Sequence, residues 1–218
     1  MKVEITGQVG PSLLSDGVGT QPFRQGRLGE AIVQQLHGRY YELAKRGSLF
    51  IVSTPAAGVT VPIYTNAAQQ FVIYNPVSSG IDIVLKRVWV GYVSGTMVAG
   101  HMCYAGSVGQ GAPGTITQAN VQNARLVTNL STASGAGNKG NYYSPGSPAT
   151  ALVAANYLRP MGNSQVAQAA VGTNSPWVQM DDVEGGIIVP PQGILVVASN
   201  VAAASVSAIA ALVEEVPV

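Results

Sequence analysis

The feature that most constrains the fold is a long stretch without any charged side chain, which runs from Gly185 to Val213. A membrane-spanning helix needs about 20 mostly apolar residues, so the length of this stretch alone favours a membrane segment. The sequence Pro190-Pro191-Gln192-Gly193 would break such a helix, because proline lacks the backbone N–H and clashes with the preceding turn. Asn200 divides the remainder. The pattern therefore predicts strands joined by tight turns, over residues 186–189, 194–199 and 205–216, and no membrane segment.

Charge is scarce along the whole chain. Charged residues make up 10% of the 218 positions and the formal net charge is +1, whereas about a quarter of an ordinary soluble domain is charged. No acidic residue occurs between Asp82 and Asp181. Free monomers stay soluble through interspersed charge, and charge is depleted at the centres of interfaces. The composition therefore indicates a protein in fixed contact with copies of itself.

The chain divides into three parts. Residues 1–27 are punctuated by glycine and proline and predict an extended N-terminal arm, which is ordered only where something holds it. Residues 28–47 predict one short α-helix, with Ile32, Leu36, Tyr40 and Leu43 at helical spacing and a basic last turn before Gly47. Residues 48–218 predict a single β-sandwich domain, with long loops at about 106–123 and 131–149.

Short apolar runs between turn clusters give the expected strands of this domain. We expect them at residues 49–53, 58–63, 70–74, 81–94, 96–105, 125–130, 151–158, 177–180, 186–189, 194–199 and 205–216. Many short strands, one helix and long loops predict a mainly β fold, a β-sandwich of jelly-roll type.

The longest expected strand changes face in its middle. Ile81, Ile83 and Leu85 occupy alternate positions, and the alternation resumes one residue out of phase at Val88 and Val90. A β-bulge at Lys86-Arg87 would explain this change.

Groups that could support catalysis or hold a metal are few. His101 and Cys103 are two positions apart, so they share one face of a strand. A structural zinc site needs four ligands and a catalytic site usually three, and the neighbouring sequence offers neither another cysteine nor an acid. We therefore predict that Cys103 is a buried small side chain, and that the chain has no metal site and no cofactor.

The densest acidic group is Asp181, Asp182 and Glu184. Clustered carboxylates serve glycoside hydrolysis and calcium binding, but these three end after four residues, which is too short for an EF-hand loop. We interpret them as a solvated turn before a strand, and Glu214-Glu215 as a solvent-facing strand end.

Recognised catalytic and nucleotide-binding motifs are missing from the sequence. The chain has neither a nucleophile elbow nor a glycine-rich phosphate loop between a strand and a helix. Its basic residues are too dispersed for a nucleic-acid binder, and the first ten residues lack the apolar core of a signal peptide. We therefore expect no enzyme and no nucleic-acid partner, do not expect a small-molecule ligand, and expect synthesis in the cytoplasm without export by the usual route.

Three passages carry a resemblance to a known class of proteins. They are LHGRYYELAKRGSLFIVSTPAAGVTVP (36–62), FVIYNPVSSGIDIVLKRVWVGYV (71–93) and PPQGILVVASNVAAASVSAIAALVEEVP (190–217). They resemble virion proteins of tailed bacteriophages, and are similar to capsid cement or decoration proteins with a head-associated β-sandwich. The resemblance rests on these stretches of sequence and not on a diagnostic motif.

The resemblance implies a structural protein of the virion. Proteins of this kind form homotrimers on the outside of the phage head, contact the major capsid protein through arms or loops, and stabilise the shell without a reaction. Repeated small contacts add up through effective concentration. Ile209, Leu212 and Val213 would fill either the core or a three-fold seam. The residues that we expect to contact partners are Val3, Ile5, Leu13, Leu14, Phe23, Tyr142 and Tyr143.

Two other functions stay open. A tail- or fibre-associated module that binds a receptor or glycan is favoured by Tyr142, Tyr143 and Trp177, because aromatic faces stack on sugars. A hydrolase would have to use Asp181, Asp182 or Glu184.

Overall fold

The structure is a computed structural model, and it describes nine ranges of the chain. They are residues 7–8, 23–24, 38–66, 69–109, 120–123, 138–144, 156–165, 178–202 and 204–218. The chain divides into two compact units, Met1–Tyr41 and Glu42–Val218. In the first unit two short strands, β1 (Gly7–Gln8) and β2 (Phe23–Arg24), pair in parallel.

The helix is shorter than its predicted range. Within the described residues helical structure is limited to α1 (Tyr41–Arg46), which ends in the basic residues Lys45 and Arg46. Gly38, Arg39 and Tyr40 precede it without helical structure, and residues 28–37 lie outside the described ranges. Among the described helices, none has the length and apolar character of a membrane span.

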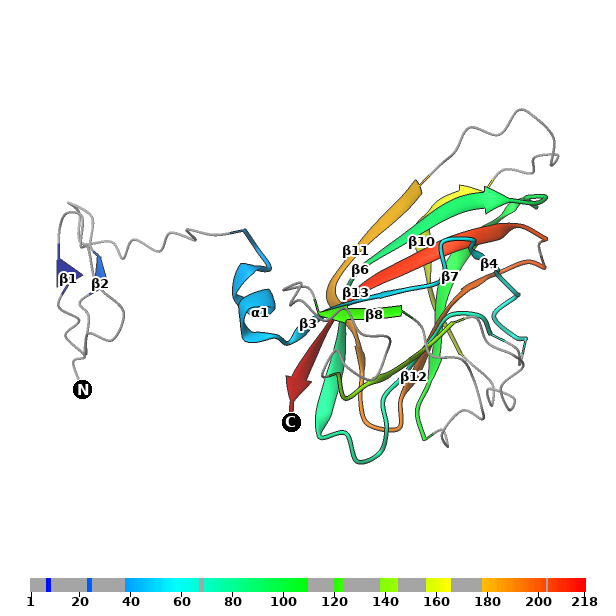
Figure 1. Cartoon of the computed structure of the whole chain (residues 1–218). Coiled ribbons are helices and arrows are strands. Elements are labelled where there is room, and N and C mark those ends of the chain that lie inside the picture. The colour runs from blue at the N-terminus through cyan, green and yellow to red at the C-terminus, as the bar shows by residue number, and fades with distance from the viewer. Residues whose placement is uncertain are drawn as a thin grey trace. The chain divides into compact units, whose positions relative to one another are not determined.

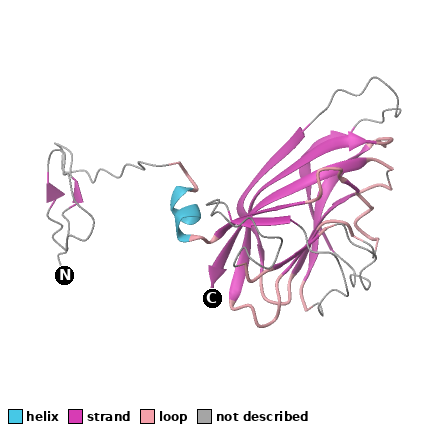
Figure 2. Cartoon of the chain, in the orientation of Figure 1, coloured by secondary structure: helices cyan, strands magenta, loops and turns pink. Residues whose placement is uncertain are grey.

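The second unit is mainly β and has a β-sandwich-like architecture of two sheets (Figure 1, Figure 2). Its strands are β3 (Leu49–Ser53), β4 (Val59–Thr60), β5 (Val72–Tyr74), β6 (Ile81–Ser94), β7 (Gly100–Ser107), β8 (Asn120–Asn123), β9 (Asn141–Tyr143), β10 (Asn156–Gln165), β11 (Val178–Val189), β12 (Ile194–Ser199) and β13 (Val206–Pro217). One sheet has the order β10-β7-β12-β5-β9, and the other has the order β11-β6-β13-β3-β8, with β4 also paired to β13.

Strands from the two halves of the chain pair in a nested order. Strand β3 pairs with β13, β5 with β12, β6 with β11 and β7 with β10, and every one of these pairs is antiparallel. Strand β13 also pairs with β6, and β12 with β7. Most pairings therefore join residues far apart in sequence, so the fold depends on long-range contacts.

The core lies between the two sheets and is built from alternate residues of each strand. In β6, Val88 and Val90 are fully buried in this core, while the residues between and after them face outward. Ile209 and Val213 of β13 belong to the same core, and Leu212 is buried on the opposite face of that strand. Of the two alternatives, core packing therefore holds for Ile209 and Val213.

Three predicted strands match the structure at both ends, namely β3, β6 and β12. Strand β11 is a single strand of 12 residues where the sequence suggested two, over 177–180 and 186–189. The predicted loops at 106–123 and 131–149 contain the end of β7 and the whole of β8 and β9. The expected strand at 125–130 lies outside the described residues, as do residues 151–155 of the one expected at 151–158.

The predicted bulge in β6 is confirmed. Arg87 pairs with Leu212 of β13 and Leu85 pairs with Val213, so Lys86 has no partner residue opposite it. Strand β11 has its own irregularity at the same level, because Asp182 pairs with Arg87 and the next paired residue is Ile187. Within it, Glu184 and Gly185 have φ angles of 55° and 83°, a conformation that glycine adopts readily and glutamate seldom does.

Candidate functional site

The acidic cluster does not form the solvated turn that we predicted, because Asp181 and Asp182 are strand residues of β11. Asp181 faces the opposite sheet, where its Oδ2 accepts a hydrogen bond of 2.7 Å from the Tyr104 hydroxyl and one of 2.7 Å from Arg159 Nη2. The Arg159 guanidinium also lies 5.0 Å from the centre of the Tyr104 ring. Asp181 therefore connects the two sheets at their β10–β11 edge.

Burial is the main cause that raises the pKa of the Tyr104 hydroxyl, and the hydrogen bond and negative charge of Asp181 add to it. Asp181 thus accepts from a neutral phenol and a guanidinium. This arrangement holds the edge of the sandwich together, and it commits both hydrogen-bonded groups to a structural contact.

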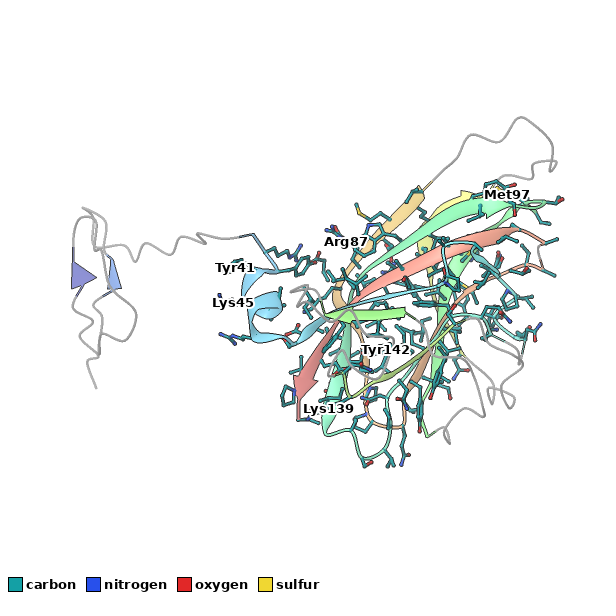
Figure 3. The ribbon with its side chains drawn as sticks, viewed as in Figure 1. Tyr41, Lys45, Arg87, Met97, Lys139 and Tyr142 are labelled. Carbon is teal, nitrogen blue, oxygen red and sulfur yellow. The ribbon has the colours of Figure 1, made fainter. Side chains whose placement is uncertain are left out.

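Asp182 points to the outer face of the six-stranded sheet, where it forms an ion pair with Arg87 through two guanidinium nitrogens. Lys86 Nζ lies 2.6 Å from Glu214 Oε2 on the same face. Arg87 lies on the outer side of the sheet in Figure 3. These four charges are therefore neutralised in pairs between neighbouring strands.

Glu215 is buried, which corrects the prediction of a solvent-facing strand end. Its Oε1 accepts hydrogen bonds of 2.8 Å from the Gly140 N–H and from the Tyr142 hydroxyl, and its Oε2 accepts one of 2.8 Å from the Lys139 N–H. Burial, followed by the charge and hydrogen bond of Glu215, raises the pKa of Tyr142. The carboxylate thus fixes the segment that leads into β9 (Figure 3).

Tyr142 therefore does not have the exposure that a partner contact requires, since its side chain is 1% exposed. Tyr143 is half-buried and packs against a small apolar cluster on the five-stranded sheet. Phe23 is a residue of β2. The other predicted contact residues, Val3, Ile5, Leu13 and Leu14, lie outside the described residues, as does Trp177.

The His101 and Cys103 side chains both belong to β7. Cys103 is buried, and burial raises the pKa of its thiol to about 11. His101 Nε2 lies 3.0 Å from the hydroxyl of Tyr157, whose ring meets that of Tyr64 edge-on at 5.8 Å. Within the described ranges, no three side chains of the metal-binding types gather in one place.

The most exposed apolar side chains of the sandwich include several on β11, which sequence reasoning missed. Val178 is 72% exposed and Met180 54% exposed, and both lie on the outer face of the six-stranded sheet. The signal was present as an alternation, because Val178 and Met180 flank the buried Gln179. The predicted strand over 177–180 contains both residues, and its alternation places them on one face.

An uncharged groove of about 270 Å³ lies near the other end of β11. Its rim includes the exposed side chains of Val108, Leu158 and Ile188. Both strands at this side of the sandwich are irregular, since β10 contains Pro160 and two register shifts and β11 contains its bulge. Irregular edges of this kind oppose the addition of a further strand.

Comparisons with known proteins give no match, whether to family models, to curated proteins or to solved structures.

Proposed function

We propose that this chain is a structural protein of a virion, a capsid cement or decoration protein that binds the outside of a phage head as a homo-oligomer and stabilises the shell. The observation that carries the proposal is the way in which the sandwich uses its few charges. Three ion pairs among the described residues join Lys86 to Glu214, Arg87 to Asp182 and Arg159 to Asp181. Glu215 is held by internal donors as well.

A surface built in this way suits permanent contact. When a partner covers charges that are already paired within one chain, the opposite charge of each pair compensates for the lost water. The desolvation penalty of association is therefore reduced. The same surface offers little long-range repulsion between copies. A freely diffusing monomer gains nothing from a lower penalty of association, whereas a shell component present in many copies does.

We also propose that the sandwich is of jelly-roll type. The support is the nested pairing, in which the first principal strand, β3, pairs with the last, β13, and the next ones pair inward to β7 with β10. Strands β8 and β9 would then be additions at the sheet edges beside β3 and β5. Jelly rolls are common in viral capsid proteins. This similarity is one of architecture, which by itself does not assign a function.

The proposal assigns no reaction and no cofactor to the chain. Asp181, the acid of this cluster that faces the other sheet, accepts from Tyr104 and Arg159. Asp182 accepts from Arg87. Hydrolysis by paired carboxylates needs one of them to act on substrate, and these contacts would have to break first.

The test uses phage particles whose genome encodes this chain. Mass spectrometry of purified particles should find the chain in fixed stoichiometry to the major capsid protein, and the purified chain should have a mass in solution above its monomer mass of 22.4 kDa, with a trimer as the expected state. Particles that lack the chain should release their genome at a lower temperature, and adding the chain back should restore the difference. Absence from purified particles, or a stable monomer with no effect on particles, would overturn the proposal.

A tail-associated module that binds glycans is the second candidate. The observation in its favour is Tyr157, which is 41% exposed and is oriented by the His101 imidazole and the Tyr64 ring. An exposed, fixed aromatic ring is a suitable stacking surface for a sugar. Binding on a glycan array that is lost in Tyr157→Ala, together with location of the chain on the tail, would favour this candidate over the first.

A further inference from the structure

Apolar and small residues gather on the outer face of three neighbouring strands of the six-stranded sheet. We name this set the β11 face, and it consists of Val178 and Met180 of β11, Trp89, Gly91 and Val93 of β6, and Ala208 and Ala210 of β13. Figure 1 shows β11, β6 and β13 side by side. None of these seven residues carries a charge.

The register of the sheet places these residues in rows. Val178 and Ala208 both pair with Gly91, and Met180 and Ala210 both pair with Trp89. Residues paired across antiparallel strands have β-carbons about 4.5–5.5 Å apart, so each row is continuous. A β-carbon built on Gly91 would lie 3.8 Å from Val178 Cγ2, with no closer neighbour. The face is therefore low at Gly91, between Val178 and Ala208 of the same row and beside the larger Met180 and Trp89 side chains of the next row.

The charges next to the face are already compensated. The row beyond Met180 and Trp89 contains the ion pair of Asp182 with Arg87, and the Arg87 guanidinium lies 5.8 Å from the centre of the Trp89 ring. The Lys86–Glu214 pair follows it. A second molecule that packs on this face therefore meets no net charge, and a copy of the same chain meets it without repulsion.

The size of the face can be compared with that of known interfaces. Three strands at about 4.8 Å spacing, over about five residues at 3.3 Å each, give a face of roughly 14 by 17 Å, or about 240 Å². Two such faces bury about 480 Å² in total, which is about half of the roughly 1,000 Å² at which specific interfaces begin. The face can therefore form one contact of an oligomer, and a stable assembly needs further contacts beside it.

We propose that the β11 face is the surface through which this chain packs against a second copy of itself. The inference rests on the proposed function, since it names the contact that holds the homo-oligomer together. Packing through a face also agrees with the irregular β10 and β11 edges, which disfavour association by strand addition. Burial of Val178, Met180 and the Trp89 ring supplies the driving force.

The test is a set of charge and size variants of the full chain, each measured by light scattering over a concentration series. Val178→Lys and Met180→Lys place an unpaired charge in the contact, and Gly91→Arg adds bulk where the sandwich itself has room. Val77→Lys is the matched control, because Val77 is a turn residue with 62% exposure outside the β11 face. Circular dichroism establishes that each variant is folded.

The expected result is at least a tenfold weaker association in the face variants and an unchanged association in Val77→Lys. If one lysine variant fails to fold, Gly91→Arg still decides the matter, because its backbone conformation suits any residue. Persistent association in all folded face variants, or equal loss in Val77→Lys, would overturn the assignment of the face and leave the proposed function standing. A wild-type chain that stays monomeric at every concentration would overturn the assignment of the face, and it would overturn the proposed function as well if the monomer had no effect on particles.

Discussion

Replacing Glu215 by glutamine should destabilise the sandwich more than almost any other isosteric change. The carboxylate is buried, and it accepts hydrogen bonds from the Tyr142 hydroxyl and from the N–H groups of Lys139 and Gly140. Glutamine keeps the shape of the side chain but exchanges one acceptor oxygen for an NH2 group. One of the three donors must then face another donor, because no rotation of the amide supplies a second acceptor.

The magnitude follows from these contacts. A hydrogen bond to a charged group contributes about 1.5–3 kcal/mol, and a buried donor without a partner costs about 1–3 kcal/mol. Allowing for partial overlap of these two effects, Glu215→Gln should lower the free energy of unfolding by about 2–4 kcal/mol. Domains of this size lose about 2–4 °C in melting temperature per kcal/mol, so the expected decrease is about 4–16 °C. Tyr142→Phe removes one donor and should cost about 1–2 kcal/mol.

The assay is urea unfolding of the full chain at pH 7, followed by circular dichroism, with both single variants and the double variant. The two effects should be non-additive, with a coupling of about 1 kcal/mol, because the side chains share one hydrogen bond. Val77→Thr, a change of similar size at an exposed turn position, is the control and should stay within about 0.5 kcal/mol of wild type. A folded Glu215→Gln variant as stable as this control would refute the idea that the carboxylate holds the segment before β9.

Three further predictions test other buried groups. Gln179 is buried and its amide atoms have no hydrogen-bond partner within the part of the chain that the structure describes, so Gln179→Met should raise the free energy of urea unfolding by about 1–3 kcal/mol, and a decrease would show that the amide is satisfied. Cys103, whose pKa is raised to about 11, should react with a thiol reagent at pH 8 only at the rate of unfolding; fast labelling of the native chain would contradict its burial. The pKa values of Tyr104 and Tyr142 are raised by burial above the value of about 10 for an unfolded tyrosine. The two hydroxyl groups therefore contribute their full stability below about pH 10, and this stability should be lost as the pH rises above about 10. Absorbance at 295 nm should show no tyrosinate from these two residues before the chain unfolds.

Local sequence patterns predicted the strands well where apolar alternation is bounded by turns. The ranges of β3, β6 and β12 follow from such patterns, and the phase change at Lys86 gave the bulge. The continuous strand β11 was harder, because Asp181, Asp182 and Glu184 have the composition of a turn. The strand conformation of Asp181 and Asp182 is stabilised by Arg159 and Arg87, which lie on other strands.

The candidate site was less predictable for the same reason. Glu215 lies near the end of the chain among residues that alternate toward solvent, and its donors come from residues 139, 140 and 142, more than 70 positions earlier. No local pattern links these positions. Similarly, the segment around Tyr142 and Tyr143 has the polar composition of an exposed loop. The pairing of β9 with β5 instead places the Tyr142 ring inside the sandwich.

The bulge at Lys86 explains why the outer face of the sheet can be neutral. In a regular strand Lys86 and Arg87 would point to opposite faces, so one cation would enter the core between Leu85 and Val88. The extra residue keeps both cations on the outer face, where Lys86 reaches Glu214 on one neighbouring strand and Arg87 reaches Asp182 on the other. A burial penalty of several kcal/mol is thereby replaced by two cross-strand ion pairs. The same local insertion thus protects the core and leaves the apolar rows of the β11 face beside a charge-balanced border, which is the condition for packing against an identical copy.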